Sequence, residues 1–103
     1  MDSNGLLKLL DITLRVVDSS ELSLRNKNFV DAQLNILNMR YLLRTESGEI
    51  LKYHSGGNLI THLEVAYEDA RDEKYSQDML EQVKVYLRQT RLSVLSGNVV
   101  SGQ

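Results

Sequence analysis

Cysteine, proline and tryptophan are all absent from the 103 residues of this chain. Without cysteine there is no disulfide framework, no thiol nucleophile and no thiolate ligand for zinc. Without proline the chain lacks the residue that interrupts helices and punctuates many-turned β-sandwiches, which favours long helices. These absences exclude disulfide-stapled domains, thiolate zinc modules and enzymes that use a thiol nucleophile.

Long apolar runs and a strong net charge are also missing. The most apolar stretch, residues 6–17, is interrupted by Lys8, Asp11 and Arg15 and is shorter than the roughly 20 residues that span a bilayer. The first residues lack the basic region and cleavage site of a secretory signal. A net charge of −2 gives no basic excess for phosphate binding. We therefore expect a cytoplasmic protein that uses no membrane and binds no nucleic acid strongly.

The first half of the chain has two segments with helical periodicity. Apolar residues recur at three- and four-residue steps from Leu6 to Val17, which predicts a helix from about residue 3 to at least 17, and residues 26–28 form a polar stop. A second helix is predicted over 29–44, with its buried stripe at Leu34, Leu37 and Tyr41. The two segments together predict an antiparallel αα-hairpin.

The second half repeats this organisation. Asn58 is a good N-cap for a helix that ends near residue 73, and Ser76 for a helix that ends before Gly97, a suitable left-handed terminal residue. The fold class we expect is therefore all-α, a four-helix bundle of two antiparallel αα-hairpins in a single domain over 1–97. The small, polar residues 98–103 are expected to form a flexible tail.

Residues 46–54 give conflicting signals. Gly48 could end the preceding helix in a left-handed conformation, or it could lie in the bend of a β-hairpin that pairs residues 41–44 with 49–53. The helix ending is favoured because Tyr41 continues the helical stripe and a lone two-stranded ribbon is marginal in water. A short extended segment at residues 50–53 stays open.

The chain is similar to itself when shifted by 46 residues, so that residues 25–29 fall on residues 71–75. Each segment is a polar turn that ends in an aromatic residue. The same shift places the expected stripe of the second helix on apolar residues of the last helix: Leu34 on Leu80, Leu37 on Val83, and Tyr41 on Leu87. The match predicts two similar hairpins, and leaves open whether they arose by duplication.

Two local features are candidates for binding. Free N–H groups at a helix start can hold an anion, so the glycine-rich loop before the third helix is a candidate anion site, formed by His54, Ser55, Gly56, Gly57 and Asn58. The third helix carries carboxylates four residues apart, at Glu64, Glu68 and Asp72, which we expect to face a partner protein with a basic surface. The alternatives are a simple connector and a solvated helix back.

The helices 29–44 and 76–95 carry more apolar residues than one buried stripe requires. This breadth predicts a homo-oligomer, most simply a twofold dimer, whose interface is formed by Met39, Leu43, Val85 and Leu92. The alternative is a monomer with scattered exposed apolar groups.

The sequence shows no catalytic constellation, metal site or cofactor motif. The chain is therefore expected to be a non-enzymatic protein–protein interaction module, such as a small regulator, adaptor, inhibitor or immunity-type protein, that acts as a homo-oligomer. One alternative is a sensor or sequestering protein that binds a small anion or nucleotide at residues 54–58. The other is a nucleic-acid-binding regulator that uses the basic residues of the last helix, Lys84, Arg88 and Arg91.

Overall fold

The computed structural model describes residues 3–74 and 76–97. These residues form five helices, α1 (Ser3–Arg25), α2 (Phe29–Thr45), α3 (Ser47–Ile50), α4 (Gly56–Arg71) and α5 (Gln77–Ser96). The expected all-α fold of two antiparallel hairpins is confirmed. The expected flexible tail at 98–103 lies outside the described residues.

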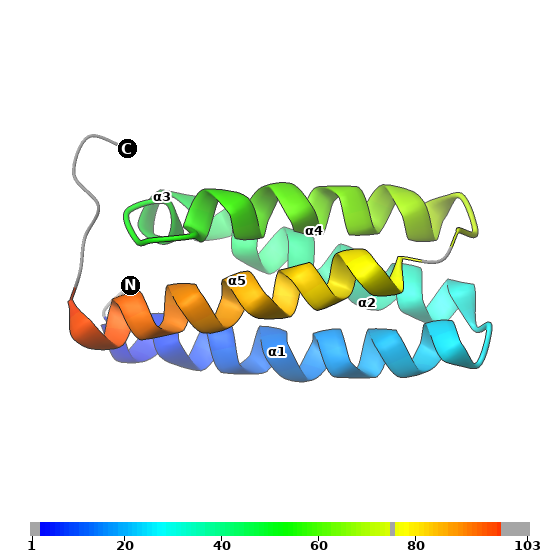
Figure 1. Ribbon diagram of the computed structural model, residues 1–103, viewed down its shortest axis with the longest axis horizontal. Coiled ribbons are helices and arrows are strands. Elements are labelled where there is room, and N and C mark those ends of the chain that lie inside the picture. Colours follow the sequence, from blue (N-terminus) through cyan, green and yellow to red (C-terminus); the bar gives the residue numbers. More distant parts are fainter. Residues whose placement is uncertain (1–2, 75, 98–103) are drawn as a thin grey trace.

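The four long helices form an elongated bundle of 40 × 23 × 20 Å. Helix α1 packs against α2 and α5, and α4 packs against the same two helices. As a result α2 and α5 occupy opposite corners of the bundle, with α2 behind α5 in Figure 1. The short α3 lies at the end of the bundle where α1 begins and α5 ends (Figure 1).

The turns of the two hairpins have the same backbone structure. In the first turn Lys27 has a positive φ of 57°, and in the second Glu73 has a φ of 59°. Three N–H groups of the first turn, at residues 26, 27 and 28, donate to the carbonyls of residues 22, 24 and 23. The N–H groups of residues 72, 73 and 74 donate to the carbonyls of residues 68, 70 and 69, each 46 residues later. The shift seen in the sequence is thus a real structural equivalence at the turns.

The equivalence at 46 residues also holds for the buried faces of α1 and α4. It pairs buried residues of the two helices in order: Thr13 with Leu59, Val17 with Leu63, Ser20 with Ala66, and Leu24 with Ala70. In α2 and α5 the buried residues instead correspond at a shift of 44, which pairs Ile36 with Leu80, Met39 with Val83, and Leu43 with Leu87. The expected alignment of the second helices is therefore wrong by two residues.

The two connections also differ in length. Helix α2 follows α1 after residues 26–28, whereas α5 follows α4 after residues 72–76. The buried stripe predicted for α2 at Leu34, Leu37 and Tyr41 is wrong, since all three residues are exposed.

The segment at 46–54 contains neither a β-hairpin nor a left-handed Gly48. Gly48 is helical in α3, and Ile50, expected as open to an extended conformation, ends that helix and is buried. Burial of Ile50 explains why the chain turns inward here instead of forming an exposed ribbon.

Helix α4 begins three residues earlier than predicted. Ser55, with a φ of 69°, precedes its first residue, Gly56, and Asn58 is not the N-cap. A Cβ atom at Gly56 would lie 2.0 Å from the carbonyl oxygen of Ile50, so only glycine allows α3 and α4 to approach this closely. At α5 the predicted boundaries are confirmed, because Ser76 precedes this helix and the left-handed Gly97 ends it, although the Ser76 side chain makes no capping hydrogen bond.

Candidate functional site

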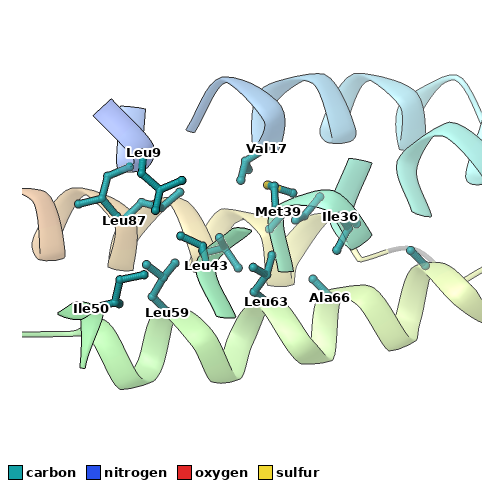
Figure 2. Close-up of a cluster of buried hydrophobic side chains, with 14 of the residues drawn as sticks. Leu9, Val17, Ile36, Met39, Leu43, Ile50, Leu59, Leu63, Ala66 and Leu87 are labelled. Atoms are coloured by element: carbon teal, nitrogen blue, oxygen red, sulfur yellow. The ribbon is translucent and has the colours of Figure 1, made fainter. Parts of the chain in front are cut away.

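Helix α2 turns three apolar residues into the core. Figure 2 shows Ile36, Met39 and Leu43 pointing between the helices toward Leu59 and Leu63 of α4. Met39 and Leu43 are each 1% exposed. The prediction that these two residues form an oligomer interface is therefore wrong, because the chain itself already buries them.

The opposite side of α2 is also apolar, and it faces solvent. Val30, Leu34, Leu37 and Tyr41 follow one another at steps of four, three and four residues, roughly 160° around the helix from the buried face. Their exposed fractions are 67%, 52%, 37% and 73%. We call these four residues the outer α2 face. Sequence reasoning assigned three of them to the core, although two apolar stripes on one helix already signalled a second contact surface.

Helix α5 shows that the bundle does not require an apolar outer face. At the shift of 44 residues that relates the buried faces, the α5 positions equivalent to Leu34, Leu37 and Tyr41 are Asp78, Glu81 and Val85. Two of these three residues are charged, and they occupy the opposite corner of the bundle. The apolar character of the outer α2 face is thus a property of that surface and not of the fold.

Charged residues border the outer α2 face on the side of α4. The guanidinium Nε of Arg40 donates to Glu64 Oε2 at 2.6 Å, and the same guanidinium lies 4.8 Å from the centre of the Tyr67 ring. Glu68 lies 3.7 Å from Arg71, and Asp72 follows the last residue of α4. Of the carboxylates predicted as a partner site, Glu64 lies beside α2 through its contact with Arg40, and Glu68 is paired with Arg71 of its own helix.

The other two residues of the predicted oligomer interface, Val85 and Leu92, are exposed on α5. Their outer face also carries Glu81 and Arg88, which lie within one turn of Val85 on the same side of the helix. Association through Val85 and Leu92 remains a prediction, and this surface is more polar than the outer α2 face.

The predicted anion site lies beside a cavity of about 500 Å³. Four of its five residues line that cavity together with three neighbours: His54, Ser55, Gly57 and Asn58, with Leu51, Tyr53 and Thr61. The fifth, Gly56, is buried against Ile50. The loop is held by α5, because the Ser55 hydroxyl donates to Gln89 and the His54 N–H donates to the Ser93 hydroxyl at 3.2 Å.

A cluster of charged residues links α1 and α5. Lys84 Nζ lies 2.7 Å from Glu21 Oε1, 3.0 Å from Glu81 Oε1 and 3.9 Å from Asp18 Oδ1. Burial of Glu21 and its hydrogen bond to Glu81 raise the pKa of the Glu21 carboxyl, against the opposing effect of Lys84. The hydrogen bond to Glu21 raises the pKa of Lys84, and the hydrogen bond from Glu21 lowers the pKa of Glu81.

This cluster changes the interpretation of the basic last helix. Lys84 is directed at carboxylates of its own chain, and Arg91 Nε donates to Asp11 Oδ1 at 2.8 Å. Two of the three cations considered for nucleic-acid binding thus hold α5 on α1. The geometry gives no support to a phosphate-binding row at Lys84, Arg88 and Arg91.

Comparisons of the chain with protein-family models, with curated proteins and with solved structures found no match. In the described part of the chain no helix has both the length and the apolar content needed to cross a membrane. Residues 3–74 and 76–97 also contain no group of three or more His, Asp or Glu side chains placed to hold a metal ion.

Proposed function

We propose that the chain is a non-enzymatic protein-interaction module that binds another polypeptide through the outer α2 face. The observation that supports this function is the apolar character of that face at positions where α5 has charged residues. Contiguous exposed apolar surface that a fold does not need is typical of a contact surface. A small regulator, adaptor, inhibitor or immunity-type protein acts by presenting such a surface.

The charged border of the outer α2 face supplies selectivity in this proposal. Arg40 and Glu64 would form part of the polar rim of the interface, with the apolar stripe at its centre, as in known interfaces. Charges at a rim influence the rate and the specificity of association more than its affinity. A bound polypeptide would therefore place an apolar helix face or groove on α2 and complementary charges opposite the rim.

Capture experiments with matched variants test the proposal. The tagged chain is used to capture proteins from a native lysate, and each captured protein is purified and its affinity measured again. The double variant Leu34→Glu/Leu37→Glu is expected to lose binding, whereas Val85→Glu/Leu92→Glu on α5 is the control and is expected to keep it. Unchanged affinity of the α2 variant for every purified partner contradicts the proposal, and loss in the α5 variant alone assigns the contact to Val85 and Leu92.

A second candidate function rests on the cavity at residues 51–61. Its volume of about 500 Å³ is in the range of small-molecule sites, and His54 and Asn58 place polar groups at its wall beside the first turn of α4. We propose a small anion or nucleotide as the ligand of this second function. Thermal unfolding with a panel of phosphates and nucleotides tests it, since a ligand at 100 times its Kd stabilises by about 2.7 kcal/mol. No shift across the panel argues against it.

A further inference from the structure

The outer α2 face has a spacing that reads the same in both directions. Its residues follow at steps of four, three and four, so reversing the helix places apolar positions on apolar positions. A second α2 helix laid antiparallel across it would set Val30 against Tyr41 and Leu34 against Leu37. A small side chain would then face a large one at each end, with four leucines, two from each copy, meeting at the centre.

From this pattern we infer that the outer α2 face binds the same face of a second copy of the chain, antiparallel about a twofold axis that passes between residues 35 and 36. The inference rests on the proposed function and names its partner. An interface of this kind is isologous, so each copy contributes the same patch and the assembly closes at two chains.

The exposed area agrees with what a stable dimer needs. With fully exposed aliphatic and aromatic side chains offering about 150 and 220 Å², the exposed fractions of Val30, Leu34, Leu37 and Tyr41 give roughly 400 Å² per chain. Two copies would bury about 800 Å² of apolar surface. Because interfaces are about 60% apolar, the complete interface would measure roughly 1,300 Å², within the standard range.

Electrostatics favours the antiparallel direction. Arg40 and Arg44 lie near the C-terminal end of α2. A parallel pair would bring these cations of the two copies to the same height, whereas the antiparallel pair places them at opposite ends. The antiparallel pair also opposes the two helix dipoles, which is the favourable arrangement for neighbouring helices. The contact therefore has one preferred direction as well as one preferred register.

Sedimentation measurements over a range of concentrations test the assembly. The wild-type chain is expected to sediment as a dimer, and Leu34→Glu/Leu37→Glu is expected to weaken dimerisation at least about 100-fold, because it charges the centre of the interface. The control Val85→Glu/Leu92→Glu is expected to dimerise like the wild type. A wild-type chain that stays monomeric at high micromolar concentration overturns the inference, as does a dimer that only the α5 variant dissociates.

Disulfide cross-linking tests the direction of the contact. The sequence contains no cysteine, so an introduced cysteine is the sole thiol. Val30→Cys mixed with Tyr41→Cys is expected to form a cross-linked dimer, while neither variant cross-links efficiently with itself. Self-cross-linking of each variant indicates a parallel contact and overturns the inference.

The two proposals fail in different ways. A monomeric wild type whose capture of another protein still depends on Leu34 and Leu37 overturns the second copy as partner and leaves the interaction function in place. A chain with neither self-association nor capture through the outer α2 face overturns both.

Discussion

The charged cluster between α1 and α5 gives a quantitative prediction for Lys84→Met. The Glu21 side chain is 4% exposed and that of Lys84 is 14% exposed, so their contact at 2.7 Å is largely removed from water. The substitution removes the ammonium and keeps most of the aliphatic stem. It leaves the Glu21 carboxylate buried without its cation, a situation that typically costs about 3–5 kcal/mol.

Protonation of the Glu21 carboxylate limits this loss of stability. The ordinary pKa of a glutamate is 4.5, so neutralising Glu21 at pH 7 costs at most about 3.4 kcal/mol, at 1.36 kcal/mol per pH unit. A neutral Glu21 can still donate a hydrogen bond to Glu81. We therefore expect Lys84→Met to lower the free energy of unfolding by about 3 kcal/mol at pH 7 and by less than about 1 kcal/mol near pH 4.5.

Urea unfolding followed by circular dichroism measures both values. Adding Glu21→Gln to the variant removes the buried charge, so the double variant is expected to recover most of the loss at pH 7 while changing little at pH 4.5. A loss below about 1 kcal/mol at pH 7, or an equal loss at both pH values, would refute the argument, because it would mean that water reaches Glu21 in the folded chain.

Three further predictions concern stability. In urea titrations, Leu43→Ala is expected to lower the free energy of unfolding by about 2–5 kcal/mol, and Leu92→Ala by less than about 0.5 kcal/mol. The reason is that only Leu43 lies in the core. Equal effects of the two substitutions would contradict the assignment of the buried and exposed faces. Gly48→Ala, with open space around it, is expected to stabilise the folded chain by about 0.5–1 kcal/mol. Gly56→Ala is expected to destabilise the folded chain by more than that, since its Cβ would clash with Ile50. Thermal melting shows whether each substitution raises or lowers the Tm. The pKa of Lys84 is raised above 10.5, so its stabilising contribution is complete below pH 10.5 and is lost as pH rises through the higher folded value. The free energy of unfolding, measured from pH 9 to 11.5, should show this loss in the wild type and not in Lys84→Met.

The parts of the fold that the sequence predicts well are those with local causes. The stop at residues 26–28 and the left-handed Gly97 at the end of α5 depend on backbone conformation within a few residues. The hydrophobic period of α1 likewise depends on residues of one helix. Each of these features could be recognised without knowing what packs against it.

The faces of α2 could not be predicted, because both sides of this helix are apolar. Periodicity gives the same signal for the stripe of Leu34, Leu37 and Tyr41 as for that of Ile36, Met39 and Leu43. The choice between them depends on how α2 is rotated about its own axis where it packs against α1 and α4. The same applies to Gly56, whose requirement for glycine comes from contact with Ile50 in another helix.

The sequence likewise predicts the residues of the candidate anion site but not the residues that anchor its loop. Four of its residues do line one cavity, as their closeness in sequence indicates, but the loop is anchored by Gln89 and Ser93 of α5. These partners lie more than 30 residues away in the chain. Long-range hydrogen bonds of this kind leave no pattern in a single sequence.

Because the two hairpins are equivalent, comparing them distinguishes apolar residues that the fold requires from apolar residues that belong only to the surface. Helices α2 and α5 occupy equivalent corners, and three buried residues of α2 correspond to three buried residues of α5. Any requirement of the bundle for apolar residues must therefore apply to both helices. Since Asp78 and Glu81 are tolerated where α2 has Leu34 and Leu37, the two leucines contribute little to packing within the chain. Their exposure is better explained by a contact that α2 makes and α5 does not, and so the search for a partner should begin at α2.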